Sequence, residues 1–270
     1  MNFSVLMSIY QQENPEYLNR AMKSIWDEQI IKPNEIVLVQ DGPLTDELYI
    51  VINRWKDTLG VILKTIPLEE NLGLGDALNI GLNNCSHELI ARMDTDDIAL
   101  SSRFKKQLKV FEDSDIDICS SWVSEFDNDE REIVSLRKIP ENHDDIISYS
   151  KIRNPINHPA VMYRKFKVLN AGGYKRMMWF EDYYLWSRMI LCGAKFYNIQ
   201  KPLVNMRAGY AQLERRRGLK YAIEEFKFFK RLHSLNFLSN SRFLKNVIIR
   251  FSARVLPKNL LKSIYKKIRY

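Results

Sequence analysis

The stretch ELIARMDTDDI, residues 88–98, decides the fold class of this chain of 270 residues. Its first part, residues 89–93, is a short apolar run typical of a buried strand. Directly after that run come three carboxylates within four positions, Asp94, Asp96 and Asp97. Carboxylates this close together repel one another unless a cation is present, and Mg²⁺ and Mn²⁺ prefer carboxylate oxygen. A solvated turn or a helix N-terminus is the alternative, but the position behind a strand favours a divalent-metal site.

Strand-like and helix-like segments alternate around this stretch. The predicted strands cover residues 3–10, 35–40, 61–66, 89–93 and 116–123, and the predicted helices cover residues 15–28, 45–56, 76 onward and 101–112. Repeated βα units of this length predict an α/β fold with a mainly parallel sheet and helices on both faces. Ligands of such sheets bind beyond the carboxyl ends of the strands. Because Asp41 and Asp94 both follow predicted strands, we expect them to converge on one crevice.

The positive charge of the chain is concentrated at its C-terminal end. Its 41 Lys and Arg residues include twelve after the last acidic residue, Glu225, so residues 1–225 carry 29 basic and 33 acidic side chains. The net charge of +8 therefore arises in the C-terminal segment, which is predicted to be helical from residue 212. A basic segment of this kind predicts an anionic partner, either a membrane surface or nucleic acid.

Two amphipathic segments on either side of Pro257 favour the membrane. In the second segment one arc of the helical wheel is apolar and the rest is basic. The apolar arc holds Leu260, Leu261, Ile264, Tyr265 and Ile268, and in the first segment a similar arc holds Phe243, Leu244, Val247, Ile248, Phe251 and Val255. A helix that packs its apolar stripe on the body is the alternative interpretation. We predict an interfacial helix on an anionic leaflet, with no nucleic acid bound.

Another acidic pair lies in the aromatic stretch WFEDYYLW, residues 179–186, at the start of a helix predicted over 181–191. A carboxylate such as Asp182 in aromatic surroundings can have a raised pKa, which suits a general base. The aromatic rings also suggest a stacking platform for a sugar ring. The alternative is that Glu181 and Asp182 simply begin a core helix.

Two further features carry weaker signals. Asn71 opens an Asn-x-Gly-x-Gly loop that lacks the spacing of a dinucleotide motif and the lysine of a P-loop. It predicts a turn where backbone approaches a ligand closely, or the lead-in to a helix. His158 precedes Pro159 and a predicted strand at 159–163, and a lone histidine is more often structural than a ligand.

Taken together and in this order, the segments resemble the family 2 glycosyltransferases, which have the GT-A fold. The resemblance covers residues 3–210 and rests on FSVLMSIY, EIVLVQDG, NLGLGDALNIGL, ELIARMDTDDI, NHPAVMYRK and WFEDYYLW. The chain is especially similar to bacterial enzymes that extend O-antigen or exopolysaccharide repeat units on a lipid carrier. These enzymes include the amylovoran-type group. The resemblance implies an inverting transfer of one sugar from a UDP-sugar, UDP-Glc or UDP-Gal, to a lipid-diphosphate-linked saccharide.

The resemblance also implies a role for each matching residue. Tyr10, Glu13 and Asp41 would hold the uracil and ribose, and Asn71 and Gly73 would line the nucleotide site with Arg92 nearby. Asp94 and Asp96 match the family DxD, which binds the ribose and a Mn²⁺ or Mg²⁺ diphosphate. Asp182 matches the catalytic base. His158 would complete the metal shell or touch the acceptor.

The implied organisation is a catalytic domain over residues 1–210 and a basic amphipathic helical tail over 211–270. The domain comprises a nucleotide-sugar-binding half, 1–97, and an acceptor-binding half, 98–210. Processive members carry Q-x-x-R-W beside membrane helices, whereas the corresponding QLERR at 212–216 has Arg in place of Trp, so polymerisation is not expected.

Two other functions remain open at this point. A sugar-phosphate nucleotidyltransferase would need a Gly-rich loop with lysine after the first strand, and residues 8–13 contain neither. A membrane- or nucleic-acid-binding module with an inactive transferase body is the other possibility. Three scattered cysteines suit a reducing cytosol, and no apolar stretch approaches the ~20 residues of a membrane span. We therefore expect a cytoplasmic protein, peripheral on the inner face of the membrane.

Overall fold

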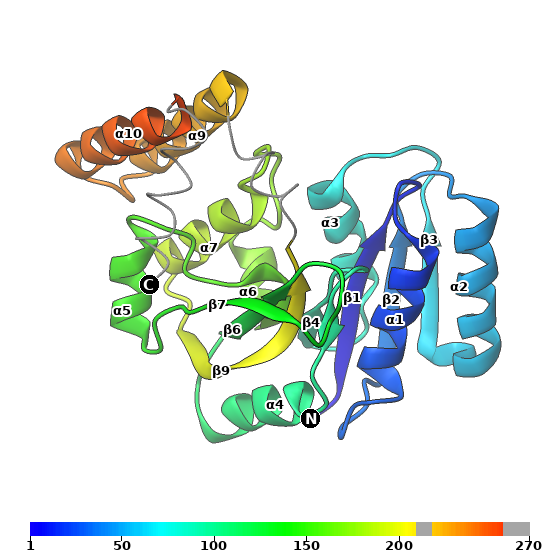
Figure 1. Ribbon diagram of the computed structural model, residues 1–270. Coiled ribbons are helices and arrows are strands. Elements are labelled where there is room, and N and C mark those ends of the chain that lie inside the picture. Colours follow the sequence, from blue (N-terminus) through cyan, green and yellow to red (C-terminus); the bar gives the residue numbers. More distant parts are fainter. Residues whose placement is uncertain (209–217, 256–270) are drawn as a thin grey trace.

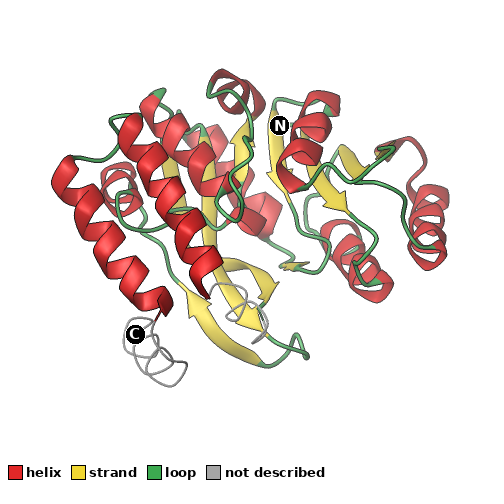
Figure 2. Ribbon diagram, turned by 90° about the horizontal axis from the view of Figure 1, so that it is seen from above, coloured by secondary structure: helices red, strands yellow, loops and turns green. Residues whose placement is uncertain are grey.

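The computed structural model describes residues 1–208 and 218–255, and within them a nine-stranded mixed sheet carries helices on both faces (Figures 1 and 2). The strands are β1 (Phe3–Ile9), β2 (Glu35–Gln40), β3 (Leu63–Pro67), β4 (Leu89–Arg92), β5 (Ile98–Ala99), β6 (Ile118–Phe126), β7 (Ile133–Arg137), β8 (Met162–Arg164) and β9 (Phe196–Arg207). The strand order is β3-β2-β1-β4-β8-β6-β9-β5, and β7 pairs with β6.

Helices lie in most connections between these strands, and two further helices follow β9. The helices are α1 (Pro15–Trp26), α2 (Asp46–Leu59), α3 (Leu74–Asn84), α4 (Arg103–Asp113), α5 (His143–Ser150), α6 (Lys165–Asn170), α7 (Glu181–Leu191), α9 (Gly218–Ser234) and α10 (Asn240–Val255), with short 3-10 turns at Gly60–Ile62 and His158–Ala160. Asn14 begins α1 by accepting backbone N–H bonds from Glu16 and Tyr17, as an N-cap does.

The predicted α/β class is confirmed. Strands β3, β2, β1 and β4 are parallel neighbours, and the longest pairings of the sheet, β6 with β9 and β1 with β2, are also parallel. All six residues of β2 are buried, because helices cover both of its faces. Antiparallel pairings of β8 with β4 and β6, and of β5 with β9, make the sheet mixed.

Alternate side chains of the strands enter two separate cores. Val5 and Met7 of β1 point into the core formed with α1, α2 and α4, whereas Leu6 points to the opposite face, into the core formed with α3 and α7. This two-residue period is the geometry of a strand. The layering places the carboxyl ends of β1, β2 and β4 at one edge of the sheet.

The helical C-terminal extension is confirmed for the described residues. Helices α9 and α10 lie side by side over α7 (Figure 1). Their shared core is aromatic: Phe228 and Phe229 of α9 are buried with Tyr183 and Tyr184 of α7. The second amphipathic segment, which follows Pro257, lies outside the described residues.

A close approach of α3 to the sheet depends on Gly81. A Cβ at this position would overlap with the Leu6 side chain of β1 and lie 2.7 Å from Val39 Cγ2 of β2. We expect Gly81→Val to lower the free energy of unfolding by about 1–3 kcal/mol, the usual cost of overpacking. Urea denaturation measures this. Asn83→Val, on the exposed face of the same helix, is the matched control, and equal losses in both variants would contradict the packing argument.

Candidate active site

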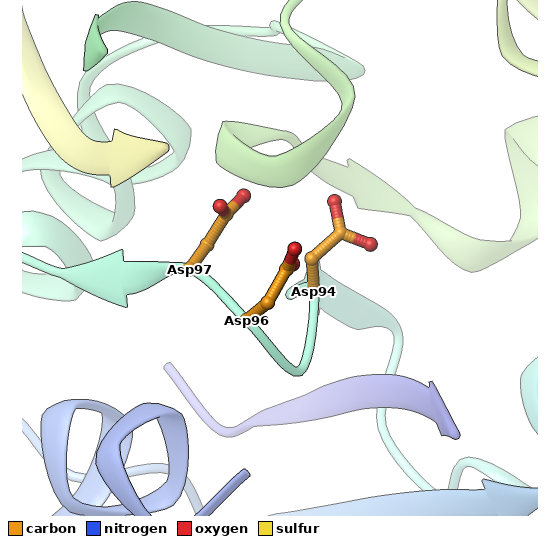
Figure 3. Close-up of side chains that lie close together, drawn as sticks. All are labelled: Asp94, Asp96 and Asp97. Carbon is orange, nitrogen blue, oxygen red and sulfur yellow. The ribbon is translucent and has the colours of Figure 1, made fainter. Parts of the chain in front are cut away.

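The acidic turn after β4 gathers three carboxylates at the edge of the sheet. Asp94, Asp96 and Asp97 each offer an oxygen that lies within 4.8 Å of the others. Their side chains point to the same side of the turn between β4 and β5 (Figure 3). The short strands on either side of the turn bring the three side chains together. The four-residue strand β4 leads directly into the turn, and the two-residue strand β5 follows it.

Burial and repulsion by neighbouring carboxylates make Asp96 and Asp97 hold protons more tightly than usual. Burial and the neighbouring Asp94 raise the pKa of Asp96 to about 6. The same two causes raise the pKa of Asp97 well above its ordinary value. Asp97 Oδ1 accepts a bond from the Arg207 backbone N–H at 2.8 Å, whereas its Oδ2 is buried without a hydrogen-bond partner. Clustered carboxylates with an unsatisfied oxygen suit a divalent cation.

Arg92, at the end of β4, supplies a buried positive charge beside the turn. Its side chain is 2% exposed and pairs with Asp94. Two of its guanidinium nitrogens, Nε and Nη1, have no hydrogen-bond partner. Because Arg92 also lines a cavity next to the turn, its positive charge favours an anionic ligand there.

Glu13 approaches the acidic turn from the loop after β1. Burial, together with Asp96 and Asp94, raises the pKa of Glu13 to about 7, and its side chain is hydrogen-bonded to Thr95. Tyr10 is exposed, and its carbonyl accepts the Glu13 backbone N–H at 3.1 Å. These two predicted residues therefore lie at the same edge of the sheet as the acidic turn.

Asp41 organises the loop that leads into α3. Its Oδ1 accepts the Leu72 N–H at 2.7 Å and its Oδ2 accepts the Gly73 N–H at 3.0 Å. Asn71 Nδ2 donates to the Asp41 carbonyl at 3.2 Å. Gly42 allows this contact, since it has φ +86 and a Cβ there would lie 2.8 Å from the Asn71 backbone nitrogen. The structure thus brings the predicted Asp41, Asn71 and Gly73 together.

A cavity of about 430 Å³ joins the acidic turn to α7. It is lined by four of the predicted residues, Arg92, Asp94, His158 and Asp182. Other lining residues come from α3, β7, β9, the segment between α5 and β8, and the segment that leads into α7: Leu74, Leu78, Arg137, Met206, Asn154, Ile156, Pro159, Tyr174, Trp179 and Glu181. Since this cavity adjoins a cluster of perturbed carboxylates, it is the place where a substrate would bind.

Asp182 lies in the first turn of α7 with both oxygens held. Its Oδ2 accepts the side-chain N–H of Asn154 at 2.7 Å, and its Oδ1 accepts the backbone N–H of Tyr183 at 2.7 Å. The adjacent Glu181 lines the same cavity, and burial raises its pKa to about 7. Both carboxylates are within the cavity wall, and hydrogen bonds orient Asp182 in particular.

His158 belongs to an aromatic part of the wall. Its Nε2 is 3.0 Å from the Tyr174 hydroxyl, and its ring lies edge-on to Trp186. Burial and the charge of Arg92 hold the pKa of His158 well below its usual value, so the ring is neutral. The carboxylate cluster found among the described residues comprises the three aspartates without this histidine. Its role in a metal shell or at the acceptor stays a prediction.

Several residues of this site were not singled out from the sequence. Asn154 orients Asp182, and Arg137 and Tyr174 line the cavity. Nothing in the spacing pointed to Asn154, because it lies 28 residues before its partner.

Comparison with known proteins identifies the kind of chain to which these features belong. The model of Glycosyl transferase family 2 matches residues 4–173. Over 267 residues the chain is 40% identical to UDP-Gal:alpha-D-GlcNAc-diphosphoundecaprenol beta-1,3-galactosyltransferase of Escherichia coli, covering 98% of this chain and 96% of that protein. It is 38% identical to the amylovoran biosynthesis glycosyltransferase AmsE of Erwinia amylovora, covering 99% of both chains.

Solved structures share the fold at low sequence identity. S. aureus TarS 1–349 in complex with UDP-GlcNAc superposes with a TM-score of 0.67 and 17% identity, covering 94% of this chain and 72% of that one. The mannosyltransferase PcManGT from Pyrobaculum calidifontis, in complex with GDP-Man and Mn²⁺, gives a TM-score of 0.64 and 16% identity, covering 99% and 80%. These similarities confirm the GT-A fold.

The carboxylates of the acidic turn lead to a prediction about metal binding. We expect Asp96→Ala to weaken Mn²⁺ binding, measured by isothermal titration calorimetry, by about tenfold or more, because losing a direct ligand costs at least as much as losing an outer partner. Asp57→Ala, which removes an exposed carboxylate on α2, is the control and should leave the affinity unchanged. Unaltered Mn²⁺ binding in Asp96→Ala would remove this turn from consideration as the metal site.

Proposed function

We propose that this chain, which belongs to glycosyltransferase family 2, transfers one galactose from UDP-Gal to a GlcNAc carried on a lipid diphosphate. The identity of 40% along nearly the whole chain to the E. coli galactosyltransferase of that specificity carries the proposal. The chain is a hexosyltransferase of polysaccharide or O-antigen biosynthesis. A hexosyltransferase is neither a sugar-phosphate nucleotidyltransferase nor a binding module with an inactive transferase body. The assignment therefore excludes both alternative functions that the sequence left open.

The acidic turn fits a divalent cation, by the chemistry of its donors. Asp94, Asp96 and Asp97 would hold Mn²⁺ or Mg²⁺, and an unsatisfied Asp97 oxygen is present among them. A cation bound there supplies positive charge for the leaving nucleoside diphosphate. PcManGT, which has the same fold, is in complex with Mn²⁺ and a nucleotide sugar, and this supports the assignment.

The donor would lie along the edge where β1, β2 and β4 end. Tyr10 and Asp41 are proposed to hold the uracil and ribose, and the loop with Asn71 and Gly73 lines the same side. Arg92 lines the cavity, and its guanidinium pairs with Asp94, which lines it too. Its guanidinium is suited to hold a donor oxygen while it neutralises part of the carboxylate charge.

Asp182 is proposed as the catalytic base. Its two oxygens are oriented by Asn154 and by the Tyr183 N–H, and the residue lines the cavity in which the acceptor would bind. It would accept the proton of the acceptor hydroxyl while that oxygen attacks the anomeric carbon from the face opposite the diphosphate. A single displacement of this kind inverts the anomeric configuration and needs no covalent intermediate.

The acceptor lipid suggests that the enzyme works at a membrane surface, on the cytoplasmic face. Among the residues that the structure describes, no helix has the length and apolar character needed to cross a bilayer. Helix α10 instead leaves Leu244, Ile248, Ile249 and Phe251 exposed, beside its basic residues. Together with the basic segment after Pro257, this surface is proposed to lie on anionic lipid.

The assignment of the base predicts the effect of Asp182→Asn. This variant should keep its affinity for UDP while kcat falls by about 10²–10⁴, the range for loss of general-base catalysis. The matched control is Asp144→Asn, an exposed aspartate in the first turn of α5. A loss of UDP affinity with kcat preserved would contradict the assignment and turn attention to Glu181.

The role of the C-terminal segment is tested by shortening the chain. We expect a variant ending at Leu256 to lose co-sedimentation with phosphatidylglycerol vesicles and to keep its activity on a short, water-soluble acceptor. The cut leaves Arg250 and Arg254 in place, because they neutralise the buried Glu225. Phosphatidylcholine vesicles are the control. Equal binding of both proteins to anionic vesicles would refute a membrane role for the removed segment.

A further inference from the structure

Trp179 has an unusual backbone conformation for its residue type. Its φ is +67, in the left-handed region, and the other non-glycine residue with positive φ among the described ones is Asn236. Asparagine tolerates this region, whereas a bulky residue there is a genuine outlier. Such strained residues cluster at functional sites, where the surrounding structure holds them. The backbone conformation of Trp179 therefore suggests that its indole ring has a function.

The indole ring forms part of the cavity wall. Trp179 lines the same cavity as Asp94 and Asp182, and the residue is 41% exposed. One face of the ring is stacked on Tyr221 of α9, with ring centroids 5.0 Å apart and an interplanar angle of 24°. An aromatic ring that is covered on one face and exposed overall offers its second face to a ligand.

The partner ring is firmly held within the C-terminal helices. Tyr221 is 5% exposed, and the centroids of its ring and the Phe180 ring are 5.4 Å apart. The guanidinium of Arg254 in α10 lies 4.6 Å from the Tyr221 ring, and the Arg254 Nε donates to Glu225 at 2.9 Å. The aromatic stack is thus fixed by a buried ion pair, which makes α9 and α10 the support of the cavity wall.

We propose that Trp179 is the stacking platform for the sugar ring of the acceptor. The inference rests on the proposed function. Asp182, three residues further along the chain, would receive the acceptor's proton, so the acceptor ring lies next to this segment. The donor diphosphate belongs near Arg92 and Asp94, which line the same cavity. The negative face of an indole attracts the partly positive C–H groups of a sugar.

This platform also defines the class of acceptor. A pyranose with equatorial hydroxyl groups presents a face of C–H bonds, which can lie flat against an aromatic ring. An axial hydroxyl group on that face would hold the sugar away from the ring and lose the contact. We therefore expect the acceptor to be a hexosamine or hexose of the all-equatorial type, bound with its C–H face on Trp179.

The experiment compares steady-state kinetics of full-length variants with UDP-Gal and a GlcNAc-diphosphate-lipid analogue. Trp179→Ala should raise the KM for the acceptor about tenfold, the change that matches a stacking contact of usual strength. The affinity for UDP and the slow hydrolysis of UDP-Gal without acceptor should be unchanged. Trp179→Phe, which keeps an aromatic face, should recover most of the loss. An unchanged acceptor KM, or a loss of UDP affinity instead, would overturn the proposal.

Two further variants separate stacking from folding. Trp179→Gly removes the ring and accommodates the positive φ, so it should fold and show the same acceptor defect. Phe166→Ala removes an exposed aromatic ring on α6 and should behave as the wild type. If Trp179→Gly binds the acceptor normally, the platform is refuted.

A separate measurement covers the case in which the wild-type protein does not transfer galactose. That result alone would refute the proposed donor and acceptor. Saturation-transfer NMR with the GlcNAc-diphosphate analogue then reports contact of the sugar C–H protons directly. Contact in the wild type that is lost in Trp179→Gly supports the platform, and no contact in the wild type overturns it.

Discussion

The crowding of three carboxylates behind β4 is the constraint on which the rest of the site depends. The protein interior offsets their charge with two buried guanidinium groups. Arg92 pairs with Asp94, and Arg103 of α4, fully buried, donates to the Arg92 carbonyl and to Gln107. Burial, and secondarily Arg92, lower the pKa of Arg103 to about 9, which still leaves it charged at neutral pH. The turn therefore keeps positive charge beside it, and the proposed divalent cation would complete the balance.

The same turn is tied to the end of the last strand by Arg207. The Arg207 backbone N–H donates to Asp97 at 2.8 Å and its Nε donates to the Asp96 carbonyl at 3.3 Å. Its guanidinium also lies over the rings of Tyr17 and Phe126, 3.7 and 4.6 Å from their centroids. A single side chain thus joins the carboxylate cluster to α1 and β6, so the position of the turn relative to both halves of the sheet is set by packing and charge together.

The C-terminal helices are connected physically to the loop that orients the proposed base. Asn246 of α10 donates to the Lys151 carbonyl at 2.7 Å, and Lys151 Nζ donates to the Phe237 carbonyl at 2.7 Å. Asn154, which orients Asp182, lies three residues beyond Lys151. The exposed apolar residues of α10 belong to the proposed membrane surface. The same helix contacts the loop that orients Asp182, so one helix separates this surface from the proposed acceptor side of the cavity.

The sequence by itself determined the features that depend on neighbouring residues. The apolar runs predicted β1 and β2 closely, and the start of α1 at residue 15 and the bounds of α7 at 181–191 were predicted as found. The carboxylates of the acidic turn lie together because they are close neighbours in the chain. Only the tertiary structure decided which distant segments meet. Strand β9, for example, runs from Phe196 to Arg207 because it pairs with the distant strand β6 along most of that length. Likewise Asn154 meets Asp182 and Tyr221 meets Trp179. The raised pKa values of Glu13 and Asp96 arise from burial by the whole fold, and burial is a property of packing that no local pattern of residues specifies.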